Sequence, residues 1–314
     1  MTHVLVTGGA GFIGSHIVDA YLARGWRVTA LDNLSTGNRR NLNPRAEFME
    51  ADLRDAATFT RIAELKPDVI SHHAAQIDVR HSVADPASDA EVNIVASIRL
   101  LQTAHEIGAR RFVFASTGGA IYGEPVVAPQ TEEHPRNPLS PYGCAKLAVE
   151  HYLHFYREIY GLKTVALRYG NVYGPRQNAK GEAGVIAIFA DKLLRGETVT
   201  INGSGEQTRD YVYVGDVVAA NLAVTDIEDG GAFNVGTGVE TSVNELYALL
   251  AAEVGTGLEA GHGPAKAGEQ LRSVIDGSRL RELARLPEPV ALRDGMRETV
   301  AYFRQLTGSA TGAT

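Results

Sequence analysis

The 314-residue sequence contains one cysteine, Cys144, and one tryptophan. A single thiol offers no disulfide framework, so we expect a reducing, cytoplasmic setting. No apolar run approaches the about 20 residues that a membrane-spanning helix needs, and we therefore predict no membrane association. The chain carries 30 Lys and Arg against 37 Asp and Glu, a net charge of -7. This balance argues against sequence-independent binding of nucleic acid, which requires a basic surface.

The segment from Val4 to Asp32 predicts a strand, a glycine turn, a helix and a second strand. Gly8, Gly11 and Gly14 are spaced so that the turn can bend sharply and its N–H groups can approach a phosphate. A pyrophosphate would then lie at the helix N-terminus. A carboxylate at Asp32 accepts the ribose hydroxyls and repels a 2′-phosphate, which favours NAD over NADP.

Strands alternate with helical segments as far as residues 164–168. This alternation predicts an α/β fold, a Rossmann-type doubly wound parallel sheet whose ligands bind at the carboxyl ends of the strands. Beyond that strand the spacing of strands and helices becomes irregular. We therefore predict an NAD-binding domain at 1–174 and a smaller C-terminal substrate-binding domain at 175–314. Some segments of the second part are able to return to the first domain. Helices are expected at 185–194, 216–224, 243–254 and 293–306, and a frayed tail at 307–314, which contains only Gly, Ser, Ala and Thr.

A helix start at Ser140 and Pro141 precedes Tyr142 and Lys146, which lie four residues apart on one helical face. The simple alternative is a core aromatic beside a snorkelling lysine, because three apolar residues continue the stripe: Val149, Leu153 and Tyr156. Next to a dinucleotide fold, however, an ammonium lowers the pKa of a nearby phenol from about 10 and makes it a usable base.

Ser116 and Thr117 end another predicted strand, where a hydroxyl can share a proton with a substrate oxygen. The alternative is a simple turn, which Ser and Thr favour. His72 and His73 are adjacent and face opposite sides of a strand, and nothing nearby completes a ligand shell, so we predict no metal site.

In chain order, these motifs resemble the extended short-chain dehydrogenases/reductases, and within that family most closely the UDP-glucose 4-epimerases. The resemblance covers nearly the whole chain. Besides the glycine turn, the Ser/Thr strand end and the Tyr–Lys pair, it depends on four segments: Asp32–Gly37, His73–Gln76, Arg168–Arg176 and Arg209–Val212.

The resemblance implies that NAD is the cofactor, Tyr142 the base, Lys146 its partner and Thr117 the catalytic hydroxyl. An extra glycine between Thr117 and Tyr122 leaves Ser116 as the alternative hydroxyl. Besides Tyr142 and Lys146, the implied cofactor contacts are Gly8, Gly11, Phe12, Ile13, Gly14, Asp32, Asn33, Ser35, Thr36, Gly37, Asp52, Leu53, Ala74, Ala75, Gln76, Asn93 and Tyr169.

A UDP-sugar is the implied substrate. Asn171 and Arg209 would hold its sugar or diphosphate, and a late loop its ribose and phosphates. The complete set of implied contacts is Thr117, Asn171, Gly184, Val185, Ile186, Arg209, Glu269, Arg272 and Ser273. The resemblance also implies a homodimer, which the apolar stripes of segments 91–107 and 142–160 favour.

Gly118 and Gly119 stand where related dehydratases and decarboxylases have an acidic residue. Without that acid a departing hydroxyl has no proton donor, whereas oxidation and reduction at one carbon need only Tyr142. We therefore expect C4 epimerisation between UDP-glucose and UDP-galactose through a 4-keto intermediate, and also of UDP-N-acetylhexosamines because Ser273 is small. The alternatives are another sugar-nucleotide enzyme on this scaffold (a dehydratase, decarboxylase or uronate epimerase) and a non-catalytic NAD-sensing protein.

Overall fold

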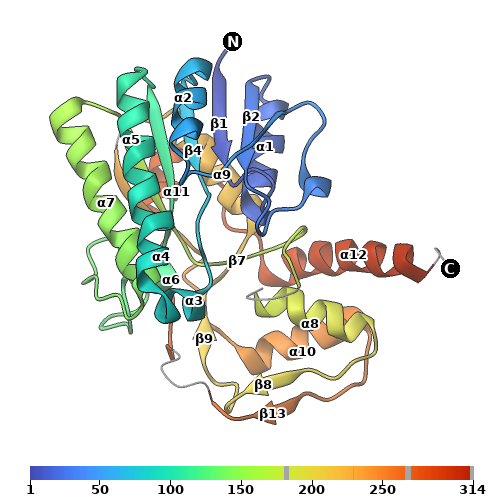
Figure 1. The fold of residues 1–314 in the computed structure, drawn as a ribbon. Coiled ribbons are helices and arrows are strands. Elements are labelled where there is room, and N and C mark those ends of the chain that lie inside the picture. Colours follow the sequence, from blue (N-terminus) through green and yellow to red (C-terminus); the bar gives the residue numbers. More distant parts are fainter. Residues whose placement is uncertain (180–183, 229, 266–269, 312–314) are drawn as a thin grey trace.

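The computed structural model describes residues 1–179, 184–228, 230–265 and 270–311. A seven-stranded sheet in the order β11-β6-β5-β4-β1-β2-β3 forms its centre, and every neighbouring pair is parallel (Figure 1). The strands are β1 (His3–Thr7), β2 (Arg27–Asp32), β3 (Glu47–Glu50), β4 (Val69–His72), β5 (Arg111–Thr117), β6 (Thr164–Tyr169) and β11 (Gly231–Val235). The predicted Rossmann-type doubly wound sheet is confirmed.

Helices cover both faces of the sheet because the strands are apolar on both faces. Within β1, for example, Leu5 packs into one hydrophobic cluster, whereas Val4 and Val6 pack into another. The first cluster is completed by α2 (Ala56–Leu65), α5 (Ala96–Glu106) and α7 (Pro141–Tyr160), and the opposite face is covered by α1 (Phe12–Ala23), α9 (Val214–Ala223) and α11 (Ser278–Ala284).

Short elements follow the carboxyl ends of several strands, where the predicted ligand residues lie. The turn η1 (Arg39–Asn41) follows β2, and three consecutive pieces follow β4: α3 (Val79–Ala84), α4 (Pro86–Ala90) and the π-helical turn η2 (Glu91–Val95). The one-turn helix α6 (Gly118–Ile121) begins where β5 ends. This end of the sheet is therefore built from loops and short helices, the kind of segment on which binding residues are commonly placed.

A further hydrophobic cluster is formed by helices that lie next to the carboxyl ends of the strands (Figure 1). It contains α8 (Val185–Leu194), α10 (Val243–Val254) and α12 (Leu292–Thr311), beside the pair β8 (Thr200–Asn202) and β13 (Gly261–Gly263). A reciprocal capping box between Ser242 and Glu245 starts α10. Two further strand pairs complete the topology: β7 (Asn171–Tyr173) with β10 (Tyr211–Tyr213), and β9 (Thr208–Arg209) with β12 (Thr241–Ser242).

Segments beyond residue 174 return to the first sheet. Strand β11 pairs with β6, and α9 and α11 pack on the sheet face that α1 covers. The chain therefore passes more than once between the seven-stranded sheet and the cluster of α8, α10 and α12. The domain boundary at 174/175 stays a prediction.

The expected helices at 185–194 and 243–254 coincide with α8 and α10. The expected frayed tail is wrong for residues 307–311, because α12 continues to Thr311, and residues 312–314 lie outside the described residues. Extending a helix that has already formed costs little, and Thr307 donates its hydroxyl to the carbonyl of Phe303 (3.1 Å). Among the described residues, no helix combines the length and the apolar character needed to cross a membrane.

Candidate functional site

The glycine turn between β1 and α1 has no space for side chains. Gly8 has φ +69°, and a Cβ atom there would lie 2.8 Å from the amide nitrogen of Ala74. A Cβ atom on Gly14 would lie 2.1 Å from the carbonyl oxygen of Gly8. Helix α1 begins at Phe12, and its N-cap Gly11 makes no side-chain hydrogen bond. The first N–H groups of the helix, including that of Ile13, can therefore face an anion, as a pyrophosphate requires.

Asp32 lies at the carboxyl end of β2, beside the glycine turn. Its carboxylate accepts hydrogen bonds from the backbone N–H groups of Ala10 (3.0 Å) and Leu34 (2.8 Å). Each oxygen retains a second lone pair, which a ribose hydroxyl could use. A Cβ atom on Gly37 would lie 2.6 Å from this carboxylate, so the predicted cofactor loop packs directly against it.

The loops after β2 and β3 are joined by side chains of the predicted cofactor set. Asn33 donates to the Asp52 carboxylate (2.9 Å) and accepts from the Ser35 hydroxyl (2.7 Å). Hydrogen bonding from Arg54 lowers the pKa of Asp52, so this side chain is an anionic acceptor. The structure brings these three residues together next to Asp32, while Leu53 lies buried in the core behind them.

The loop after β4 is held by Gln76 and Asn93. The backbone N–H and C=O groups of Gln76 both bond to the Asn93 side-chain amide (3.0 and 2.9 Å), and Asn93 also donates to the buried carboxylate of Asp89 (3.0 Å). Asn93 lies in the π-helical turn η2, a feature common at functional sites. Ala74 and Ala75 lie between β4 and Gln76, and the N–H of Ala74 donates to the Thr7 hydroxyl (3.2 Å).

Tyr169 ends β6 and stacks on the His73 ring, with the two planes 5° apart. Burial lowers the pKa of His73 to about 3, so this imidazole is neutral. The predicted cofactor residues thus come from the carboxyl ends of five strands, β1, β2, β3, β4 and β6, and lie along one edge of the sheet. They fit a bound dinucleotide.

Tyr142 and Lys146 lie in the first turns of α7, which Ser140 caps by accepting from the N–H of Gly143 (3.1 Å). The Lys146 ammonium donates to the carbonyl of Ala115 in β5 (2.9 Å), and its nitrogen lies 5.7 Å from the centre of the Tyr142 ring. Because Ala115 is two residues before Thr117 in the same strand, the three predicted catalytic residues come from adjoining parts of β5 and α7.

The pKa of Tyr142 departs from the expected direction. Burial raises it, and the charge of Asp89 raises it further. Burial also lowers the pKa of Lys146 to about 8, against the opposing charges of Asp89 and Glu150. The expected lowering of the phenol pKa is therefore wrong, because burial disfavours the charged phenolate and the nearby Asp89 carboxylate disfavours it further.

The two candidate hydroxyls at the end of β5 differ in their partners. Ser116 is buried and donates to the Glu150 carboxylate (2.5 Å), which also pairs with Arg168 (2.6 Å). The Thr117 hydroxyl lies 3.8 Å from the point that a Cβ atom on Gly119 would occupy. These positions favour Thr117 as the hydroxyl that can reach a substrate.

Gly119 marks the place where predicted substrate residues converge. Its hypothetical Cβ atom would lie 3.6 Å from Asn171 Oδ1 and 3.8 Å from Ser273 Oγ, besides the Thr117 contact. Three distant segments thus surround one glycine: the end of β5, β7 and the segment before α11. An acidic side chain at position 119 would fill this space.

The remaining predicted substrate residues lie farther along the chain. Gly184 precedes α8, which Val185 and Ile186 begin. Arg209 is in β9, and the guanidinium of Arg272 forms an ion pair with Glu240 (2.7 Å). Glu269 lies outside the described residues, which contain no cluster of three or more His, Cys, Asp or Glu side chains suited to a metal.

Two buried carboxylates of the site are not predicted by the sequence motifs. Glu150 links Ser116 to Arg168, and its place one helical turn after Lys146 was the available signal. Asp210, within the Arg209–Val212 motif, accepts hydrogen bonds from the backbone N–H groups of Thr237, Gly238 and Ile275. Both carboxylates position segments around Gly119.

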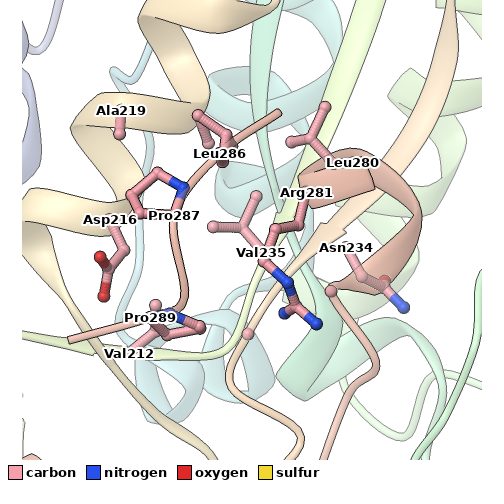
Figure 2. Close-up of a pocket in the computed structure, with 13 residues that line it drawn as sticks. Val212, Asp216, Ala219, Asn234, Val235, Leu280, Arg281, Leu286, Pro287 and Pro289 are labelled. Carbon is pink, nitrogen blue, oxygen red and sulfur yellow. The ribbon is translucent and has the colours of Figure 1, made fainter. Parts of the chain in front are cut away.

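One of two cavities is lined by predicted site residues, and the other is not. A cavity of about 950 Å³ is lined by Phe12, Thr36 and Gly37 of the predicted cofactor set. A smaller one of about 40 Å³, shown in Figure 2, lies between α9 and α11 and is lined mainly by apolar side chains with Asp216 and Arg281. Its volume suits one or two water molecules, and it contains none of the predicted site residues.

Comparison with known proteins gives concordant matches. The model of the NAD dependent epimerase/dehydratase family matches residues 4–236. The UDP-glucose 4-epimerase of Mycolicibacterium smegmatis is 47% identical over 306 residues, 96% of this chain and 98% of that protein. The crystal structure of Thermotoga maritima UDP-glucose 4-epimerase with UDP-glucose is 47% identical, with a TM-score of 0.95 over 98% of this chain and all of that one. The Thermus thermophilus UDP-glucose 4-epimerase in complex with NAD is 46% identical, with a TM-score of 0.91 over 96% and 99% of the two chains.

Proposed function

The chain belongs to the NAD-dependent epimerase/dehydratase family, and on that premise we propose that it interconverts UDP-glucose and UDP-galactose by epimerisation at C4. The observation that carries the proposal is the convergence of Thr117, Asn171 and Ser273 on Gly119, in a site that also contains Tyr142 and Lys146. Family membership confirms the resemblance drawn from the motifs, and NAD is the cofactor.

The proposed reaction oxidises and then reduces one carbon. Tyr142 accepts the proton of the sugar 4-hydroxyl and later returns it, while the Thr117 hydroxyl bonds to the reacting oxygen. NAD, held by the glycine turn and Asp32, would supply the hydride acceptor and donor for the oxidation and the re-reduction of C4. Because burial raises the pKa of the phenol, its ionisation needs a nearby cation, and Lys146 on the same helix provides one.

The direct test incubates the purified protein with UDP-glucose, with and without added NAD, and measures UDP-galactose. Epimerisation without net consumption of NAD is expected, because the hydride returns to the sugar. A dehydrated or decarboxylated product would favour the other enzymes of this scaffold. Tight NAD binding without turnover of any UDP-sugar would favour the NAD-sensing alternative.

The partners of Ser116 and Thr117 lead to a prediction that separates the two hydroxyls. Thr117→Ala should lower kcat for UDP-glucose by about 10- to 100-fold, because it removes a hydrogen bond to the reacting oxygen. Ser116→Ala should have a smaller effect on kcat and mainly lower the melting temperature, since the Ser116 hydroxyl bonds to the buried Glu150. A larger loss of kcat in Ser116→Ala, at unchanged stability, would reverse the assignment.

We also propose a homodimer, formed through η2, α5 and α7. One face of α7 packs into the core, while Tyr152, Phe155 and Ile159 on another face are 40%, 43% and 64% exposed. An apolar stripe of this kind is typical of helices that pair with a second copy. Light scattering at micromolar concentration should give twice the chain mass, and Ile159→Glu should shift it toward the monomer. A wild-type monomer would contradict the proposal.

We also propose UDP-N-acetylhexosamines as substrates, because the residue next to Gly119 at this position, Ser273, has a small side chain. It also places the protein in the cytoplasm, in agreement with a single cysteine and no disulfide framework.

A further inference from the structure

The guanidinium of Arg272 is held by a carboxylate where a diphosphate is proposed to bind. Arg272 donates through Nε to Glu240 Oε1 (2.9 Å) and through Nη2 to Glu240 Oε2 (2.7 Å). We infer that Glu240 is an internal competitor of the substrate: its carboxylate occupies the Arg272 guanidinium until the diphosphate of the UDP-sugar replaces it. This inference rests on the proposed function.

Glu240 lies between the two arginines proposed to bind the diphosphate. Strand pairing sets Thr241 opposite Arg209, so Glu240 is adjacent to this pair in the chain. The Thr208 hydroxyl, next to Arg209, donates to Glu240 Oε1 (2.8 Å). One carboxylate therefore contacts the Arg272 side chain directly and is fixed to the strand that carries Arg209.

The exposure of this ion pair allows exchange. The Arg272 and Glu240 side chains are 51% and 27% exposed, whereas those of Arg168 and Glu150 are 2% and 7% exposed. Water and salt screen an exposed pair, so breaking it costs little. Water and ions do not reach the buried pair of Arg168 and Glu150. Both are arginine–glutamate ion pairs, but the buried Arg168–Glu150 pair is a permanent contact and the exposed Arg272–Glu240 pair can exchange its partner.

The backbone of Arg272 is fixed, so only its side chain must move. The N–H groups of Leu271 and Arg272 donate to the Glu124 carboxylate (2.5 and 3.2 Å), and Gln270 bonds through its side-chain amide to the Arg272 carbonyl (2.8 Å). A guanidinium fork matches carboxylate and phosphate oxygens equally well in geometry. A diphosphate carries more negative charge than one carboxylate, which favours the exchange.

Removing the charge of Glu240 should therefore strengthen binding of a diphosphate. Glu240→Gln retains an oxygen that can accept from Thr208, but it holds Arg272 less tightly and no longer repels phosphate groups. We expect its Kd for UDP to fall by about three- to tenfold. Uridine has no phosphate, so its Kd should not change.

Calorimetric titration of the NAD-loaded protein with UDP and with uridine tests this inference. The matched control is Glu133→Gln, which removes the carboxylate of another exposed pair, Arg279 with Glu133; its Kd for UDP should equal that of the wild type. An unchanged or weaker affinity for UDP in Glu240→Gln, or an equal gain for uridine, would overturn the inference.

Turnover of UDP-glucose by the same samples separates this inference from the proposed function. Wild-type protein that binds UDP but does not epimerise UDP-glucose would contradict the proposed function and leave the competitor role intact. An active wild type combined with no gain of UDP affinity in Glu240→Gln would contradict the competitor role alone.

Discussion

Tyr142→Phe is expected to yield a folded protein that still binds NAD but whose kcat for UDP-glucose falls by about 10²- to 10⁴-fold. The substitution removes only the phenolic oxygen, the group that accepts the proton of the sugar 4-hydroxyl. The ring stays beside Lys146, whose nitrogen lies 5.7 Å from its centre. Packing and the charge of Lys146 should therefore be preserved, and the loss should appear in kcat.

The measurement combines kcat, the NAD content of the purified protein and its melting temperature. Tyr160→Phe is a matched control, because Tyr160 ends the same helix and is 48% exposed. It should retain wild-type kcat. Near-normal turnover in Tyr142→Phe would refute the assignment of the base, and a loss of bound NAD would indicate that the tyrosine acts mainly through the cofactor.

Ser273→Tyr is expected to abolish turnover of UDP-N-acetylgalactosamine while UDP-galactose remains a substrate. Ser273 Oγ would lie 3.8 Å from a Cβ atom on Gly119, so a phenol ring at this position would occupy the space proposed for the acetamido group. The two neighbouring residues have other surroundings: Arg272 pairs with Glu240, and Val274 is buried in the interior. These surroundings favour Ser273 as the residue that limits the pocket.

The two substrates should be assayed side by side in the wild type, Ser273→Tyr and Ser273→Ala. The alanine variant keeps the pocket open, so it should turn over both sugars. Because Ser273 is buried, a tyrosine there can also strain the packing, and the retained UDP-galactose activity serves as the control for folding. A wild type that epimerises UDP-galactose but not UDP-N-acetylgalactosamine would refute the prediction.

The sequence by itself determined the features that depend on neighbouring residues. The spacing of Gly8, Gly11 and Gly14 predicts a turn without side chains, and the structure has that turn because a Cβ atom on Gly14 would collide with Gly8. The four-residue spacing of Tyr142 and Lys146 similarly follows from helical periodicity. Such features depend on backbone geometry over a few residues, and a sequence displays them directly.

Only the tertiary structure decided the features that depend on distant segments. Ser116 bonds to a residue 34 positions later, Arg272 pairs with one 32 positions earlier, and β11 enters the sheet beside β6 from beyond the predicted domain boundary. The raised pKa of Tyr142 also depends on distant segments, because all the segments that cover the side chain contribute to its desolvation. Local periodicity contains no information on which distant segment provides a partner or excludes water, and packing alone determines both.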